Sequence, residues 1–84
     1  MMNLKELKLK LKEIGVKESE YSINQGLKEN AIIVEDLGGF WKVFHYEKGH
    51  KEFVGIFKSE AEAFMGLLNS FKDDLKLLGK KTFD

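Results

Sequence analysis

The feature that most constrains this chain is a series of three short segments between residues 31 and 57 that have the character of β-strands. The segments are rich in β-branched and aromatic residues, and they are separated by Gly38-Gly39 and Lys48-Gly49, pairs that contain glycine as tight turns do. Turns this short join neighbouring antiparallel strands. The pattern therefore predicts a β-meander with strands at Ala31–Asp36, Phe40–Glu47 and Lys51–Phe57.

The register of the meander follows if each turn is a two-residue loop. Cross-strand neighbours should then combine opposite charges or matching apolar side chains, which stabilise a sheet. The expected partners are Glu35 with Lys42 and Val34 with Val43 in the first hairpin, and Phe44 with Phe53, Val43 with Val54 and Trp41 with Ile56 in the second.

Helical patterns flank the three segments. Leu4, Leu7, Leu11 and Ile14 are spaced three or four residues apart, which predicts an amphipathic helix over residues 4–14. The expected caps are Asn3 with Glu6 at its start and Gly15 at its end.

A second helix is predicted over residues 60–78, with a frayed tail at 80–84. Ser59 and Glu62 form a capping box at its start, and Gly79 is the expected end. Its apolar stripe consists of Ala61, Phe64, Met65, Leu68, Phe71, Leu75 and Leu78. Residues 16–30 are polar, and we interpret them as a loop in which Tyr21–Ile23 could form a fourth strand at the edge of the sheet.

The predicted fold is α+β: one antiparallel sheet of three or four strands with both helices packed on one face. Side chains alternate between the two faces of a strand. The compact face, suited to a cover of helices, carries Ile32, Val34, Trp41, Val43, Val54 and Ile56. The opposite face interleaves aromatic and charged side chains, as a half-exposed surface does: Ile33, Phe40, Phe44, Tyr46 and Phe53 with Glu35, Lys42 and Lys51.

Composition restricts the function of the chain. Its 84 residues suffice for a single domain, in which a deep catalytic cavity would consume much of the core. The 14 basic residues are all lysine and are balanced by 14 acidic residues, so we expect no nucleic-acid partner. The absence of cysteine, of a long apolar run and of a signal-peptide pattern favours a cytoplasmic protein with no membrane partner.

Residues that could carry chemistry are few. In the expected register His45 faces Glu52, which resembles a base and its orienting carboxylate, but the strands place no serine, threonine or cysteine beside them. A cross-strand charge pair is the better interpretation. The two histidines, His45 and His50, lack the spacing of metal ligands. We therefore expect no catalytic residue, no metal and no cofactor, and conclude that the chain is not an enzyme.

Four groups of residues stand in order along the chain: Tyr21-Ser22-Ile23-Asn24-x-Gly26-Leu27, Ala31, Trp41-x-Val43-Phe44-His45-x-Glu47-Lys48-Gly49 and Phe57-x-Ser59-Glu60-x-Glu62-Ala63. This ordered set resembles a family of small bacterial immunity proteins, immunity protein fifty-nine, from polymorphic toxin systems. The resemblance implies a cytoplasmic protein that neutralises a cognate toxin by stoichiometric binding. It also supports Trp41 and Val43 as core residues.

The function expected from the sequence is thus binding to a protein toxin through the aromatic face of the sheet. Large exposed aromatic groups usually mark interfaces. The alternative is a small structural or regulatory adaptor that forms a homodimer through the same face. The predicted partner-binding residues are Phe40, Lys42, Phe44, Tyr46, Phe53, Glu35 and Lys51.

Overall fold

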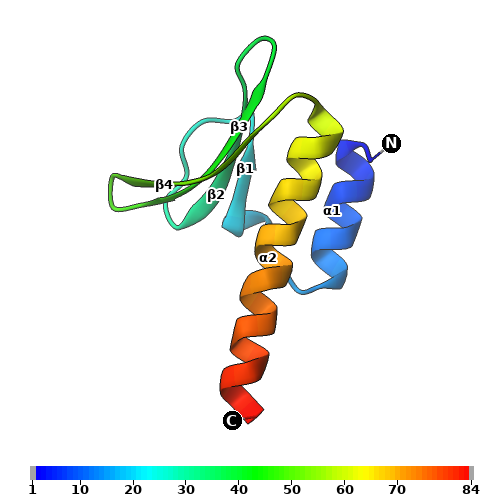
Figure 1. Cartoon of the computed structure of the whole chain (residues 1–84), viewed down its shortest axis with the longest axis vertical. Helices are drawn as coiled ribbons and strands as arrows, with labels where there is room; N and C mark the ends of the chain where they lie inside the picture. Colours follow the sequence, from blue (N-terminus) through cyan, green and yellow to red (C-terminus); the bar gives the residue numbers. More distant parts are fainter. Residues whose placement is uncertain (1, 84) are drawn as a thin grey trace.

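The chain forms an α+β fold in which two helices lie on one side of a four-stranded sheet (Figure 1). The structure is a computed structural model that describes residues 2–83, with side chains described as far as residue 73. The elements in chain order are α1 (Leu4–Glu13), the 3-10 turn η1 (Glu18–Glu20), β1 (Tyr21–Ile23), β2 (Ala31–Asp36), β3 (Trp41–Glu47), β4 (His50–Phe57) and α2 (Glu60–Phe83).

The predicted α+β fold is confirmed, and the segment Tyr21–Ile23, which the sequence left open as a fourth strand, forms an edge strand, β1, that makes the sheet mixed. β1 runs parallel to β2, whereas β2, β3 and β4 form the predicted antiparallel meander. Residues 24–30 return the chain to the start of β2. Asn24 stabilises this connection, because its backbone N–H donates to Val34 O (2.9 Å) and its side-chain Oδ1 accepts from the Asp36 N–H (2.8 Å).

The register of the first hairpin is confirmed, but that of the second hairpin holds only for its half next to the turn. Phe44 pairs with Phe53 and His45 with Glu52, whereas a β-bulge at Val54 shifts the remainder of β4 by one residue. The predicted pairs Val43 with Val54 and Trp41 with Ile56 are therefore wrong: Val43 pairs with Gly55 and Trp41 with Phe57.

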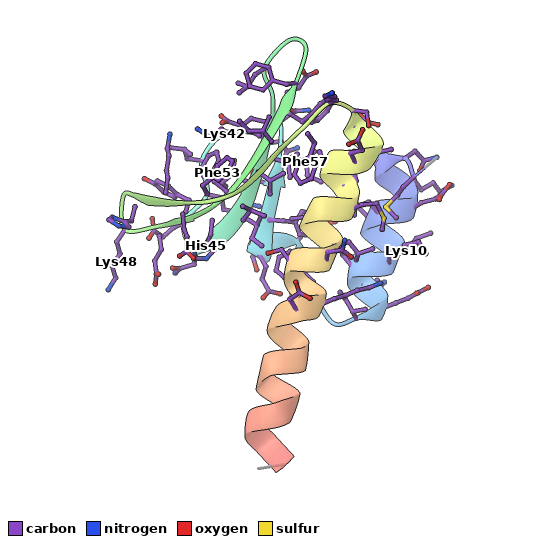
Figure 2. The ribbon with its side chains drawn as sticks, in the orientation of Figure 1. Lys10, Lys42, His45, Lys48, Phe53 and Phe57 are labelled. Atoms are coloured by element: carbon purple, nitrogen blue, oxygen red, sulfur yellow. The ribbon has the colours of Figure 1, made fainter. Side chains whose placement is uncertain are left out.

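The bulge exchanges the faces of two large apolar residues. Phe57 packs against the core between the sheet and the helices, and Figure 2 shows it between β4 and α2. Ile56, which was predicted to lie in the core, pairs with Lys42 on the opposite face and is 57% exposed. Val54, the unpaired residue of the bulge, is 38% exposed, so it is not a core residue either.

The main core lies between the sheet and the helices. Ile32, Val34 and Val43 of the sheet are buried there, as predicted, and Trp41 packs edge-on against Phe64 of α2 (ring centroids 6.1 Å apart). The helices contribute the buried residues Leu7, Leu11, Ala63, Phe64, Leu67 and Leu68.

The composition of the α2 stripe differs from the prediction in two residues. Met65 is 42% exposed, whereas Leu67 is fully buried, because a residue three positions after Phe64 returns to the same side of a helix. Leu75 and Leu78 lie outside the described side chains.

The predicted caps are present at the start of both helices. The Glu6 N–H donates to Asn3 Oδ1 (2.9 Å), and the Glu62 N–H donates to Ser59 Oγ (3.2 Å). The predicted end at Gly79 is wrong, since α2 continues to Phe83, so the part of the predicted tail that the structure describes is helical; Asp84 lies outside the described residues. Glycine permits a helix to end without requiring it, and Lys80 and Lys81 suit a last turn.

The ring of Phe57 rests against glycines on both sides. A Cβ at Gly55 would lie 2.9 Å from Phe57 Cζ, and a Cβ at Gly66 of α2 would overlap the ring more severely. Glycine at these positions therefore creates the space that lets the bulge turn Phe57 inward.

We predict that the effect of Gly66→Ala changes sign with residue 57. Alanine normally stabilises a helix by up to about 1 kcal/mol relative to glycine. Overpacking costs roughly 1–3 kcal/mol, so Gly66→Ala alone should destabilise the protein. In a Phe57→Ala background the same change should stabilise it. Urea unfolding of the four chains measures both effects, and stabilisation in both backgrounds would show that the Phe57 ring does not fill this space.

Candidate functional site

The face of the sheet opposite the helices, here called the outer face, brings together six of the seven residues predicted to bind a partner, and the seventh, Phe40, lies in the turn just before β3. Alternation along β3 places Lys42, Phe44 and Tyr46 on one side. The register adds the residues paired with them, in the rows Glu35–Lys42–Ile56, Ile33–Phe44–Phe53 and Ala31–Tyr46–Lys51. Figure 2 shows Lys42 and Phe53 on the side of the sheet away from α2.

Phe44 lies beneath this surface and cannot contact a partner directly. It is 1% exposed and forms a second, smaller core with Ala31 and Ile33, against which Tyr46 packs. Its predicted role as a contact residue is therefore wrong. The physical reason is that two lysine side chains reach over its ring: Lys42 Nζ is 5.6 Å and Lys51 Nζ is 5.1 Å from the ring centroid, within the range of cation–π attraction.

The β1–β2 end of the outer face is covered by the chain itself. Ser22 pairs with Ile33 and is buried, and its Oγ donates to Gly26 O (2.8 Å). The connection at residues 24–30 thus folds against this end of the sheet, where Ile33 and Ala31 are fully buried. The part of the outer face open to a partner lies over β3 and β4.

Two large apolar side chains remain exposed there, Phe53 (60%) and Ile56 (57%), and a third, Phe40 (42%), is exposed in the turn that leads into β3. We call these three residues the outer patch. Ile56 was not predicted, because strict alternation assigned it to the opposite face. A signal for it exists in the sequence, since an isolated glycine within a strand, here Gly55, often accompanies a bulge.

Charged groups border the outer patch. Lys42, on β3, is paired with Glu35 on one side and Ile56 on the other, while Lys51 flanks Phe53 on β4. Lys42 and Glu35 are half-buried, and Lys51 is exposed. The surface therefore combines exposed apolar side chains with a border of two lysines and one glutamate.

The His45 and Glu52 pair lies on the helical side, near Ser70 of α2. These three residues line a hollow of about 230 Å³ together with Ile32 and Val54. A catalytic triad requires hydrogen bonds from nucleophile to base and from base to carboxylate. The hydrogen bonds found among residues with described side chains do not join His45, Glu52 and Ser70. Their arrangement gives no support to a nucleophilic mechanism.

Residues 2–83 contain no helix that is long and apolar enough to cross a membrane. Among the described side chains, no three or more metal-ligating residues gather into a group that could hold an ion.

Comparison of the chain with family models, with curated proteins and with solved structures gave no match.

Proposed function

We propose that the protein is a non-enzymatic inhibitor that neutralises a cognate bacterial toxin in the cytoplasm by binding it stoichiometrically through the outer patch. The observation that carries the proposal is the exposure of Phe53 and Ile56 on a sheet face that neither helix covers, with Phe40 exposed in the adjoining turn. Aromatic and aliphatic groups in such positions commonly anchor protein–protein interfaces. The ordered motif groups in the sequence supply the reason for choosing a toxin as the partner.

The layer beneath the patch suits tight binding. Phe44 and Ile33 are buried directly under it, so the patch rests on a packed core of the sheet and its backbone is held by the ladders on both sides of β3. A surface already ordered before binding loses little conformational entropy when the complex forms. Binding through such a surface requires no movement of the helices.

The size of the molecule is compatible with an interface of standard area. A stable complex buries about 800 Å² on each partner. This is roughly one eighth of the 5954 Å² exposed by the chain. The outer face over β3 and β4, with the turns at its two ends, is the surface from which this area would come.

A homodimeric adaptor is the second candidate function. β4 is an edge strand of the sheet and carries two of the three patch residues, Phe53 and Ile56. Exposed edge strands can pair with a second copy. The bulge at Val54 opposes such pairing, because a bulge interrupts the regular row of backbone hydrogen-bonding groups along β4.

The experiment that separates these functions is affinity capture of the tagged protein from its native host, followed by a growth test. We expect a protein with a toxic domain to co-purify in a 1:1 ratio, and we expect co-expression of this chain to restore growth of cells that produce that domain. Recovery of the chain only as a dimer, from a host shown to make the toxin, would reject neutralisation and favour the adaptor.

A further inference from the structure

A second surface of the molecule, separate from the outer patch, forms a groove of about 580 Å³ beside α1. One wall is α1, and the other is the segment that follows it, which turns back at Gly15 (φ 87°). The groove is lined by Lys5, Lys8, Leu9, Lys12, Gly15, Val16, Lys17, Glu18 and Tyr21. None of these residues belongs to the outer face.

The charge of this groove is strongly positive although the chain as a whole is neutral. Residues advance by about 100° around a helix, so Lys5, Lys8 and Lys12 fall within an arc of roughly 60°. Lys17 adds a fourth positive charge from the opposite wall. Glu18 is the one acidic residue among those lining the groove, which leaves a formal excess of three positive charges.

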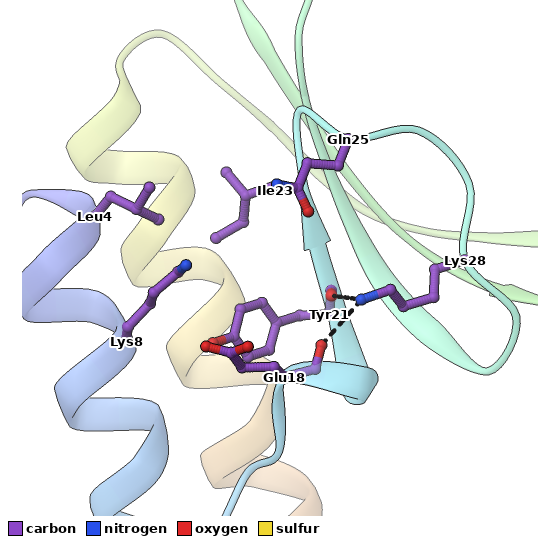
Figure 3. A pocket seen from close by; sticks show the side chains of 7 residues that line it. All are labelled: Leu4, Lys8, Glu18, Tyr21, Ile23, Gln25 and Lys28. Carbon is purple, nitrogen blue, oxygen red and sulfur yellow. Dashed lines mark hydrogen bonds between the residues drawn. The ribbon is translucent and has the colours of Figure 1, made fainter.

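The lysines of the groove differ from the neighbouring Lys28. Lys28 Nζ donates to two backbone carbonyls, Glu18 O and Tyr21 O, each at 3.1 Å (Figure 3). By contrast, the hydrogen bonds found where side chains are described do not include the Nζ atoms of Lys5, Lys8 and Lys12. These ammonium groups are available to an external anion.

Apolar surface lies between these charges. Leu9 is 56% exposed at the rim, and Val16 is half-buried. Tyr21 is buried, and its burial, with the nearby charge of Glu18, raises the pKa of the phenol above its usual value of 10.0. The phenol therefore stays neutral at physiological pH, and it adds no negative charge that would repel an acidic ligand.

We propose that this basic groove binds an extended acidic segment of another protein, in which carboxylates contact Lys8 and Lys12 on α1 and the apolar side chain between them, which points the other way, contacts Val16 on the opposite wall. Lys5 and Lys12 are separated by about 10 Å along the helix, which is too far for one small anion to bridge. The rise from Lys8 to Lys12 is about 6 Å, close to the roughly 6.7 Å between alternate residues of an extended chain.

Two other classes of anionic ligand, membranes and nucleic acids, fit the groove less well. To bind a membrane, α1 would have to insert its apolar face, as amphipathic helices on membranes do. The apolar residues of that face, Leu7 and Leu11, are fully buried in the core. Nucleic acid is usually held by arginine forks or by a basic domain, and this chain has neither.

The test uses the whole chain and a fluorescein-labelled peptide of eight alternating glutamate and leucine residues. Fluorescence anisotropy should show binding that weakens as salt is raised. Lys8→Glu with Lys12→Glu should weaken it at least tenfold. Lys10→Glu is the matched control, because Lys10 lies about 160° around the helix from each of those lysines, and it should leave binding unchanged.

Three results would overturn this proposal. The first is equal binding of a glutamine–leucine peptide, which would show that charge does not matter. The second is equal binding by the Lys8→Glu, Lys12→Glu chain. The third is binding to phosphatidylglycerol vesicles without binding to the peptide, which would identify a membrane surface. None of these results bears on the outer patch, so neutralisation of a toxin stands or fails separately.

Discussion

Replacing Phe44 with alanine is expected to lower the free energy of unfolding by about 3–5 kcal/mol, the usual cost of removing a buried phenylalanine ring. Phe44 is 1% exposed and is the largest member of the core on the outer face. The substitution leaves a cavity next to Ile33 and removes the ring over which Lys42 and Lys51 lie. A domain of this size has only about 4–12 kcal/mol in total, so much of the protein should unfold on mild heating.

The measurement is urea unfolding followed by circular dichroism, with Phe53→Ala as the matched control. Phe53 is the cross-strand partner of Phe44 on the same face, but it is 60% exposed. Its loss should cost less than about 1 kcal/mol, in line with substitutions at exposed positions. Phe44→Leu should fold and show an intermediate loss. Equal small effects of Phe44→Ala and Phe53→Ala would contradict the burial of Phe44.

Replacing Phe53 or Ile56 with alanine is expected to weaken toxin binding by about 30-fold or more each, while the protein remains folded. A buried anchor of an interface contributes about 2 kcal/mol or more, and each 1.4 kcal/mol changes the dissociation constant tenfold. Both side chains are more than half exposed in the free chain, so truncation removes contacts with a partner and not with the core. Titration calorimetry with the purified toxin domain measures the change.

The matched control for this experiment is Leu4→Ala. Leu4 is also a large apolar residue, 41% exposed, but it lies on α1, away from the outer face. Its truncation should leave the affinity within about twofold of the original chain. If Phe53→Ala and Ile56→Ala bind the toxin as tightly as Leu4→Ala does, the outer patch is not the contact surface, even when the toxin itself has been correctly identified.

Much of the fold could be predicted because its determinants are local. The caps at Asn3 and Ser59 depend on hydrogen bonds within one turn, and the first hairpin depends on a short turn with alternating side chains on either side. The direction of β1 was not predictable in this way. It depends on how residues 24–30 pack against the outer face, through contacts such as that of Ser22 with Gly26.

The sequence predicted most of the residues on the candidate surface, but it did not predict which of them are exposed and which are buried. Lys42, Phe53 and Lys51 are grouped as expected, since they follow from alternation and register. Alternation gives the side of a sheet on which a residue lies and says nothing of what covers it. Phe44 was therefore wrongly taken for a contact residue.

The sequence by itself determined which segments become helices and strands, where most of them begin, and that the helices cover the face of Val34 and Val43. These properties arise from periodicity and from hydrogen bonds between near neighbours. Tertiary structure alone decided that Phe57 turns inward and Ile56 outward, because the bulge at Val54 is stabilised where the Phe57 ring meets the glycines of β4 and α2. Gly55 signals locally that a bulge can form, but the contact of the Phe57 ring with Gly66 joins two different elements, and only the tertiary structure supplies it.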